Sequence, residues 1–290
     1  MKIGVVFPQT EVDHDPQWIR TFTQRLEALG YDHVLAYEHV LGVEASHPQA
    51  VKGPYGIEDS FLSPLVLFSA MAALSEKLEF ATAIMVLPQR DAVLVAKQAA
   101  TLDVLSGGRL RLGVGVGWNA AEFAALGADF SNRGRCIEEQ VRVLKELWTQ
   151  PVVNFSGEWY QLEHVGIRPL PIQKPIPVWF GGYADVVLRR IAKMGAGWFP
   201  GFSEVEEAKP QLDHLARYVE AEGRSWSDIG IEVRIRYGDG DLDDLGDRVE
   251  AWSRLGISHL SINTMRSGLK HKEDHLEAIE RFAELIPDGA

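Results

Sequence analysis

The 290-residue sequence contains a single cysteine, Cys136. One cysteine forms no intrachain disulfide, so the chain fits a reducing compartment and we expect a cytoplasmic protein. Long hydrophobic runs are also missing, because the most apolar helix-like stretch, Leu62 to Leu74, is interrupted by two serines and a proline. It falls short of the roughly 20 residues that span a bilayer, and the N-terminus lacks the apolar core of a secretory signal. We therefore expect neither a membrane span nor export.

Basic residues are also fewer than acidic ones. The sequence has 29 lysines and arginines against 41 aspartates and glutamates, which gives a net charge of −12. A surface of that charge repels polyanions, so we expect no nucleic acid and no membrane among the partners. The remaining composition, 46% apolar and 24% charged, is that of an ordinary globular chain, and its length allows one large domain or two medium ones.

What the sequence does contain is a regular alternation of short apolar runs with segments of helical periodicity. Short apolar runs predict buried strands, and apolar residues spaced by three and four predict helices with one buried face. The predicted strands cover residues 3–7, 34–37, 78–86, 110–116, 178–180, 197–199, 231–235 and 259–263. The predicted helices cover residues 18–29, 62–75, 92–105, 133–148, 185–193, 205–222, 242–255 and 273–285.

Strands that are each followed by a helix predict an α/β fold of the closed (β/α)8, or TIM-barrel, type in one domain over residues 1–290. No interdomain linker interrupts the alternation, so an open doubly wound sheet is disfavoured. Insertions are expected after the second and fourth strands. The first includes residues 42–60, and the second, residues 151–177, holds five prolines and a predicted hairpin at Ser156-Gly157. We expect these loops to shape the substrate pocket.

In such a barrel the loops that follow the strands converge on one face, where reacting groups lie. Gly181-Gly182-Tyr183 ends the fifth strand and opens a helix, an arrangement typical of an anion site and equally of a tight turn that binds nothing. Residues 115–120 fit the loose GxGxxA pattern, but they follow the fourth strand and no acidic residue about 20 positions later ends a strand, so a dinucleotide fold is disfavoured. Gly117 instead lets a flat ligand approach the backbone.

Few side chains at these strand ends can carry chemistry. His39 follows Glu38 at the end of the second strand, where an imidazole can donate a hydrogen bond or transfer a proton near neutral pH. A histidine that merely packs there is the alternative. Pro8, Trp118 and Trp198 lie at or near strand ends and predict an apolar substrate pocket suited to a planar ligand.

Motifs of several other enzyme classes are absent. The sequence has no HxH after the first strand, no lysine at a predicted strand end and no GxSxG, which disfavours metal-dependent hydrolases, Schiff-base aldolases and serine hydrolases. His271 and His275 form HxxxH at the start of an expected solvated helix, without the HExxH zinc signature. We therefore expect no metal.

Three groups of motifs carry a family resemblance. They are Leu87-Pro88-Gln89-Arg90 leading into residues 96–103, Ser106-Gly107-Gly108-Arg109 followed by residues 113–118, and residues 169–177 leading into Gly181-Gly182. Over nearly the whole chain these motifs resemble the bacterial luciferase-like family of flavin-dependent barrel enzymes. Within that family, residues 4–9 and Tyr37-Glu38-His39-Val40 look most like the branch that uses the deazaflavin coenzyme F420.

The resemblance implies an oxidoreductase that uses coenzyme F420 for hydride transfer to or from a small organic substrate. An FMN-dependent monooxygenase acting with reduced flavin and oxygen, and a flavin-binding protein without catalysis, are the alternatives. The resemblance also implies that the chain can form a homodimer.

The same resemblance assigns residues to the site. It implies that His39 is the catalytic residue, although Glu38 stands where relatives more often have aspartate. Ala83 and Ile84 match a bulge of the third strand at which the family often has a cis peptide bond. The implied cofactor-binding residues are Glu38, His39, Ala83, Ile84, Gly115, Val116, Gly117, Asn119, Gly181, Gly182 and Tyr183. The last three of these are implied to bind the cofactor phosphate.

Overall fold

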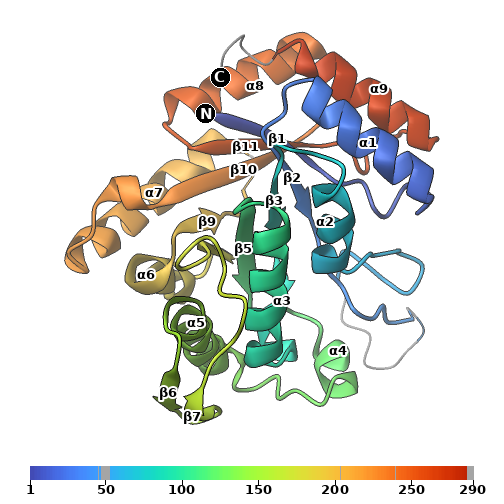
Figure 1. The fold of residues 1–290 in the computed structure, drawn as a ribbon. Coiled ribbons are helices and arrows are strands. Elements are labelled where there is room, and N and C mark those ends of the chain that lie inside the picture. Colours follow the sequence, from blue (N-terminus) through green and yellow to red (C-terminus); the bar gives the residue numbers. More distant parts are fainter. Residues whose placement is uncertain (45, 47–52, 203, 239, 286–290) are drawn as a thin grey trace.

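The structure, a computed structural model, describes residues 1–44, 46, 53–202, 204–238 and 240–285. Within them, parallel strands pair in the order β1-β2-β3-β5-β8-β9-β10-β11, and β11 pairs with β1 again. The strands are β1 (Lys2–Val6), β2 (His33–Ala36), β3 (Glu79–Thr82), β4 (Met85–Val86), β5 (Leu110–Gly115), β8 (Val178–Gly181), β9 (Gly197–Phe199), β10 (Gly230–Arg236) and β11 (His259–Asn263). The predicted closed barrel is confirmed, and Figure 1 shows the helices arranged around it.

The helices other than α4 cover the outside of the barrel (Figure 1). The helices are α1 (Pro16–Ala28), α2 (Pro64–Ala72), α3 (Ala92–Leu105), α4 (Ala120–Ala125), α5 (Arg133–Thr149), α6 (Asp185–Met194), α7 (Val205–Ala221), α8 (Leu242–Arg254) and α9 (Lys272–Ala283). In α1, the Asp15 side chain caps the start by accepting from the Gln17 amide, and Trp18 and Phe22 form the buried face. Gly30, with a φ of 82°, follows its end.

The third predicted strand is divided in two. The peptide bond between Ala83 and Ile84 is cis, as the family resemblance implies. β3 and β4 both pair with β5, but the stretch from Phe80 to Val86 is one residue longer than the matching stretch from Leu110 to Gly115, so the chain bulges between β3 and β4. This bulge lies near the C-terminal end of the barrel.

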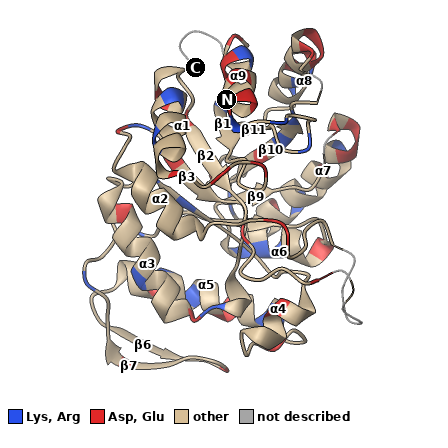
Figure 2. Ribbon diagram, turned by 90° about the vertical axis from the view of Figure 1, so that its right-hand side faces the viewer, with Lys and Arg blue, Asp and Glu red and all other residues tan. Residues whose placement is uncertain are grey.

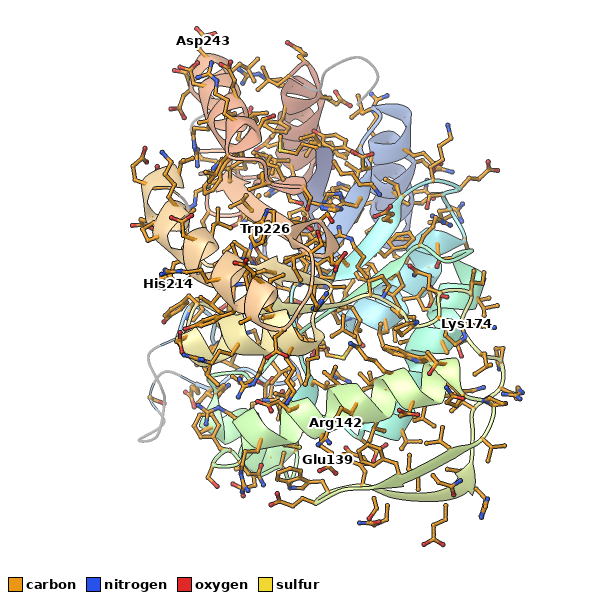
Figure 3. All side chains as sticks on the ribbon, turned by 90° about the vertical axis from the view of Figure 1, so that its left-hand side faces the viewer. Glu139, Arg142, Lys174, His214, Trp226 and Asp243 are labelled. Carbon is orange, nitrogen blue, oxygen red and sulfur yellow. The ribbon has the colours of Figure 1, made fainter. Side chains whose placement is uncertain are left out.

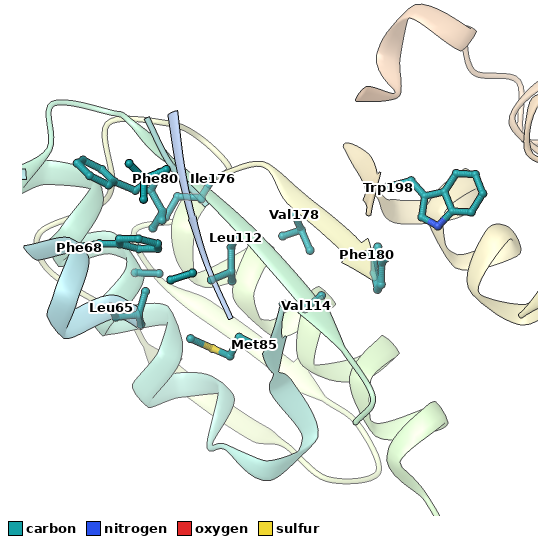
Figure 4. Close-up of a cluster of buried hydrophobic side chains, with 14 of the residues drawn as sticks. Leu65, Phe68, Phe80, Met85, Leu112, Val114, Ile176, Val178, Phe180 and Trp198 are labelled. Carbon is teal, nitrogen blue, oxygen red and sulfur yellow. The ribbon is translucent and has the colours of Figure 1, made fainter. Parts of the chain in front are cut away.

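Side chains alternate between the two faces of each strand, which separates the core into two layers. Apolar side chains on the outer face pack against the helices, and Figure 4 shows part of this layer, with Leu112 and Val178 on the neighbouring strands β5 and β8. A smaller cluster lies inside the barrel. Its buried members are Val6, Leu35, Ala81, Ala83, Trp179, Phe199 and Met265.

Charged side chains fill the N-terminal end of the barrel interior. Glu232 is fully buried, and its Oε1 lies 2.7 Å from Nε2 of His33. Arg111 Nη1 donates to the other carboxylate oxygen, also at 2.7 Å. Gly4 has no side chain because a Cβ there would lie 2.2 Å from the His33 ring. This packed floor leaves the C-terminal end of the barrel for ligands.

Both predicted insertions are present. The segment between β2 and α2 has no helix or strand among its described residues, and residues 45 and 47–52 of the predicted loop lie outside the described part of the chain. The second insertion, residues 151–177, follows α5 and contains the predicted hairpin, formed by β6 (Val153–Ser156) and β7 (Gln161–Val165). Figure 3 shows Glu139 between α5 and this hairpin, where its carboxylate accepts hydrogen bonds from three backbone amides of the turn.

Acidic residues are frequent on the helices of the C-terminal part of the chain. Figure 2 shows them on α7, α8 and α9, whose first turns hold Glu206, Glu207, Asp243, Asp244, Glu273 and Asp274. Helix α2, in contrast, has no charged residue. Across the described ranges, no helix combines the length and the apolar character that crossing a membrane requires.

Candidate active site

A cavity of about 310 Å³ lies at the C-terminal ends of the strands. It is lined by Tyr37, Glu38, His39, Tyr55, Ala83, Ile84, Val86, Gly117, Trp118, Glu122 and Arg234. These residues come from the end of β2 and the segment between β2 and α2, from the bulge before β4 and β4 itself, from the loop after β5, from helix α4 and from strand β10. Of the predicted site residues, those that line it are Glu38, His39, Ala83, Ile84, Gly117 and Trp118.

The imidazole of His39 lies against three aromatic rings. The ring centres of Phe61, Tyr55 and Trp118 are 5.1, 5.4 and 5.5 Å from its own centre. The His39 side chain is only 11% exposed. These rings therefore fix the orientation of the imidazole and limit its contact with water, while its remaining edge faces the cavity.

A buried carboxylate lies beside this imidazole. Oε2 of Glu122 is 3.7 Å from Nδ1 of His39, and Glu122 is 1% exposed. Its Oε1 accepts hydrogen bonds from the amides of Val40 and Leu41 at 2.6 and 3.0 Å, and its Oε2 accepts from Gln89 Nε2 at 2.9 Å. Burial by itself raises the pKa of Glu122, but the neighbouring His39 and the hydrogen bonds from Gln89 and the two amides outweigh it and lower the pKa to about 2. The carboxylate is therefore charged at neutral pH.

Glu38, the neighbour of His39 in sequence, is engaged in an ion pair. Its Oε1 accepts from Arg90 Nη2 at 2.6 Å, and its Oε2 accepts from the Val86 amide at 3.0 Å. Burial raises the pKa of Glu38, and Arg90 opposes that shift. The pair ties the end of β2 to the chain that follows β4, which fixes the position of His39.

Glycines make room for the side chain of Ile84. A Cβ on Gly115 would lie 2.6 Å from Ile84 Cδ1, and a Cβ on Gly181 would lie 2.7 Å from Ile84 Cγ2. Gly117 has a φ of 70°, and a Cβ there would lie 2.5 Å from Val86 Cγ1. Ile84 is therefore packed across β5 and β8, and the glycines around it present backbone without side chains. This wall suits a planar ring system.

The start of α6 offers backbone donors beside the glycine pair. The Gly182 amide is already used, because it donates to a β9 carbonyl at 3.4 Å. Ala184 occupies the N-cap without a side-chain hydrogen bond, and the first amides of a helix have no intrahelical acceptor. The Asp185 carboxylate is held 2.8 Å from Nε of Arg189. The donors available to an anion are therefore the amides of residues 183–186.

Several predicted site residues lie outside the lining of the cavity. They are Pro8, Gly115, Val116, Asn119, Gly181, Gly182, Tyr183 and Trp198. Trp198 does not form part of a substrate pocket, because it is fully buried in the outer core and its Nε1 donates to the Gly182 carbonyl at 2.6 Å. Pro8 is buried as well. Asn119 caps α4, where its side chain accepts from the Glu122 amide.

Five lining residues were not predicted as site residues from the sequence: Tyr37, Tyr55, Val86, Glu122 and Arg234. Glu122 lies between the predicted strand at 110–116 and the predicted helix at 133–148, and no pattern there distinguishes it from an ordinary exposed carboxylate. Arg234 lies inside a predicted strand, and the charged residues at every second position there were its only signal.

Comparison with known proteins gives a family match over almost the whole chain. A family model described as Luciferase-like monooxygenase matches residues 1–279. The FMNH(2)-dependent dimethylsulfone monooxygenase of Pseudomonas putida is 34% identical over 183 residues, which are 62% of this chain and 50% of that protein. The F420-dependent glucose-6-phosphate dehydrogenase of Amycolatopsis mediterranei is 25% identical over an alignment of 295 residues, which covers 99% of this chain and 82% of that protein.

The extent of the similarity varies among relatives. The chain matches the first curated relatives, uncharacterized proteins of Mycobacterium bovis and Mycobacterium tuberculosis, over 57% of their length. Among solved structures, the coenzyme F420 dependent tetrahydromethanopterin reductase from Methanopyrus kandleri aligns with a TM-score of 0.78 over 98% of both chains, at 15% sequence identity. At that identity the similarity shows a common fold.

Proposed function

The chain belongs to the luciferase-like monooxygenase family, and from that premise we propose that it is an oxidoreductase that holds a flavin-type cofactor at the mouth of its barrel. The cofactor in this proposal is coenzyme F420, and the reaction is hydride transfer to or from a small organic molecule. The observation that supports it best is the combination, in one cavity, of the flat wall at Ile84 with the buried pair of His39 and Glu122.

The residues present fit such a cofactor. The cavity of about 310 Å³ is at the lower end of the range for small-molecule sites, about 300–1,000 Å³. Ile84 and Gly117 supply the surface on which the ring system lies. The amides of residues 183–186 bind the phosphate, because they have no partner within the helix and the positive end of the helix dipole lies there.

The chain's own side chains position the reacting molecule and handle the proton. When bound, coenzyme F420 supplies hydride transfer, and reduced FMN supplies the activation of oxygen. His39 Nδ1 faces Glu122, which leaves the Nε2 edge of the ring for the ligand. The rings of Phe61 and Trp118 restrict water around that imidazole. His39 is therefore the residue placed to hold or move a proton at Nε2.

FMN-dependent monooxygenation is the second candidate. It is favoured by the 34% identity to the Pseudomonas putida enzyme, but that match covers 62% of the chain. We place coenzyme F420 first because the match to the F420-dependent dehydrogenase extends over 99% of the chain.

Parallel titrations with coenzyme F420 and FMN, followed by absorbance and fluorescence, test the proposal. The purified chain should bind one of the two saturably and clearly more tightly than the other. In Ala184→Asp, the new side chain can cap α6, which should add about 1 kcal/mol to the free energy of unfolding. The same carboxylate puts a negative charge at the phosphate position, so cofactor binding should weaken by about tenfold or more.

Ala184→Asn is the matched control, because it caps the helix without a charge. It should retain much more of the cofactor affinity than Ala184→Asp. Negligible affinity of the wild type for both cofactors would contradict the proposal. Equal cofactor affinities of the two variants would remove the start of α6 as the phosphate site.

A further inference from the structure

A second cavity, of about 400 Å³, adjoins the candidate active site. Tyr37 and Arg234 line both cavities, so the two lie next to each other at the barrel mouth. The second cavity is also lined by Arg236 and Arg248. Three guanidinium groups therefore surround one space next to the cavity that holds His39.

Strand β10 and the helix that follows it bring these arginines together. Side chains alternate along a strand, and Val233 and Ile235 are fully buried in the outer core. Arg234 and Arg236 consequently face the interior and the rim of the barrel. Arg248 reaches the same place from α8, where its Nη1 donates to the carbonyl oxygen of Arg236 at 3.1 Å.

These arginines have few acidic partners in the part of the chain that the structure describes. Arg234 donates through Nη2 to the Pro200 carbonyl at 2.6 Å and forms no ion pair with any residue that the structure describes. Arg236 is exposed and also forms none. Arg248 has one acidic neighbour, Asp244, at 3.8 Å. In a chain with a net charge of −12, such a local excess of positive charge does not follow from composition.

We propose that this cavity binds an anionic group, a phosphate, carboxylate or sulfonate, of the substrate whose reacting end lies beside His39. The inference rests on the proposed function, which places the chemistry in the adjoining cavity. Guanidinium groups donate paired hydrogen bonds to the oxygens of such anions, and an anion relieves the repulsion among three neighbouring cations. Glu204 also lines the cavity, but it is exposed, so water and salt screen its charge.

The substrate is thus expected to be a small organic carboxylate, sulfonate or phosphate ester and not a neutral molecule. A cofactor phosphate has the same chemistry, so the experiment must separate the two sources. Saturating the protein with cofactor fills the site at the start of α6 before the second cavity is probed.

Isothermal titration of the cofactor-saturated protein with inorganic phosphate at low ionic strength is the first measurement. We expect the wild type to bind with a dissociation constant of about 1 mM or lower. Arg234→Gln and Arg236→Gln should each weaken binding by about tenfold or more, because each removes a charge-assisted contact. Arg217→Gln is the matched control: Arg217 is exposed on α7, its side chain donates to the Asp213 carbonyl, and its loss should leave binding unchanged.

Absence of phosphate binding by the wild type, or equal binding by all variants, overturns the proposal. Titration of Arg236→Gln with the cofactor identifies the source of the anion. If Arg236→Gln binds the cofactor as tightly as Arg217→Gln does, the anion belongs to the substrate. A loss of about tenfold assigns it to the cofactor and overturns the substrate assignment.

Turnover of a matched pair, a neutral alcohol and its carboxylate or phosphate analogue, completes the test. The wild type should show a KM about tenfold lower for the anionic member, and Arg236→Gln should lose that preference with kcat largely retained. Equal KM values in the wild type overturn the inference. Failure of the proposed function is distinguishable, because the wild type would then bind neither flavin-type cofactor, and the phosphate titration can still be performed on the chain alone.

Discussion

Nδ1 of His39 lies 3.7 Å from Oε2 of Glu122, although His39 follows β2 and Glu122 lies in α4, after β5. The carboxylate is held in place by the amides of Val40 and Leu41 and by the side chain of Gln89. The strand order β2-β3-β5 brings these groups together, because the segments that follow these strands lie side by side at one end of the barrel. The charged Glu122 is thus a positioning residue for the imidazole, and the aromatic rings around His39 complete the arrangement.

Glu122→Gln should lower kcat while leaving cofactor affinity nearly intact. The amide keeps the shape of the side chain but removes the charge that faces His39. Because the pKa of Glu122 is about 2, the wild-type carboxylate stays charged throughout the working pH range, so kcat should fall by a similar factor, about tenfold, at every pH between roughly 5 and 9. His39→Ala should lower kcat further, by about 100-fold, since it removes the group that we propose transfers the proton.

The measurement is kcat against pH with the cofactor that the titrations identify. Glu163→Gln, an exposed change on β7, serves as the control and should leave the profile unchanged. A Glu122→Gln profile identical to the wild type would show that the carboxylate only supports the loop. Unchanged turnover in His39→Ala would remove the histidine from the mechanism.

The sequence identified His39 but not its partner, for a physical reason. A residue at the end of a buried strand is recognisable from its neighbours, whereas Glu122 becomes functional only through contacts with loops distant in sequence. Trp198 shows the opposite error. A large aromatic residue near a strand end fits a pocket and a core equally well, and only the direction of its side chain, which packs in the outer layer, decides between them.

Glu139→Gln should loosen the hairpin from α5. The Glu139 carboxylate is 3% exposed and accepts hydrogen bonds of 2.8 Å from the amides of Glu158, Trp159 and Tyr160. A hydrogen bond to a charged group contributes about 1.5–3 kcal/mol, so we expect the free energy of unfolding in urea to fall by about 2 kcal/mol. Burial raises the pKa of Glu139, but the amides outweigh it and lower the pKa below the ordinary value of 4.5.

The pH dependence follows from that direction. A carboxylate whose pKa is lower in the folded state stabilises above the unfolded value and loses this effect as pH falls through the folded pKa. The difference in free energy of unfolding between the wild type and Glu139→Gln should therefore be largest at neutral pH and become smaller in acid. A difference that stays constant with pH would mean that charge plays no part in holding the hairpin.

Acid should destabilise the floor of the barrel, starting below about pH 6.5. Burial and the nearby Arg111 lower the pKa of His259 from 6.5 to about 2, so the folded protein keeps it neutral while the unfolded chain binds a proton. For Glu232, burial raises the pKa, but His33 and Arg111 lower it well below 4.5, which adds a second loss of stability below that value. His259→Gln should therefore flatten part of the decline between pH 6.5 and 4.5 in urea unfolding.

His214→Gln is the control for this prediction, because His214 is exposed on α7, as Figure 3 shows. That variant should keep the wild-type dependence on pH. If His259→Gln loses stability over the same interval as steeply as the wild type, proton uptake by His259 on unfolding is not the cause.

The alternation of apolar runs and amphipathic segments predicted the barrel because each strand buries its outer face under a helix. The interior was much less predictable. Arg111, Glu232 and His33 lie on separate strands, and their pairing depends on the closed strand order. His275, expected at a solvated helix start, is 1% exposed and lies 2.8 Å from the Thr264 hydroxyl. Such contacts arise from the three-dimensional arrangement and leave no local pattern in the sequence.

Gly113 and Gly115 lie on the same face of β5, yet replacement by alanine should have different effects at the two positions. A Cβ at Gly113 would lie 1.9 Å from the Thr82 carbonyl oxygen and 2.7 Å from Phe199 Cε2. The Thr82 carbonyl belongs to the backbone of β3 and cannot move away easily. Gly113→Ala should therefore lower the free energy of unfolding by about 3 kcal/mol, the upper part of the range for overpacking. At Gly115 the nearest atom is Ile84 Cδ1 at 2.6 Å, the end of a flexible side chain, so the loss of stability should be smaller.

The second effect of Gly115→Ala concerns the cavity, because a displaced Ile84 alters the wall on which the cofactor is proposed to lie. We expect cofactor affinity to fall by about tenfold, measured by titration beside urea unfolding of the same samples. Gly246→Ala in α8 is the matched control, since the nearest atom to its new Cβ is an ordinary 3.7 Å away. It should stabilise the helix by about 0.5–1 kcal/mol without changing cofactor affinity. Wild-type cofactor affinity in Gly115→Ala would show that Ile84 can move without consequence, and the wall it forms would then have no part in binding.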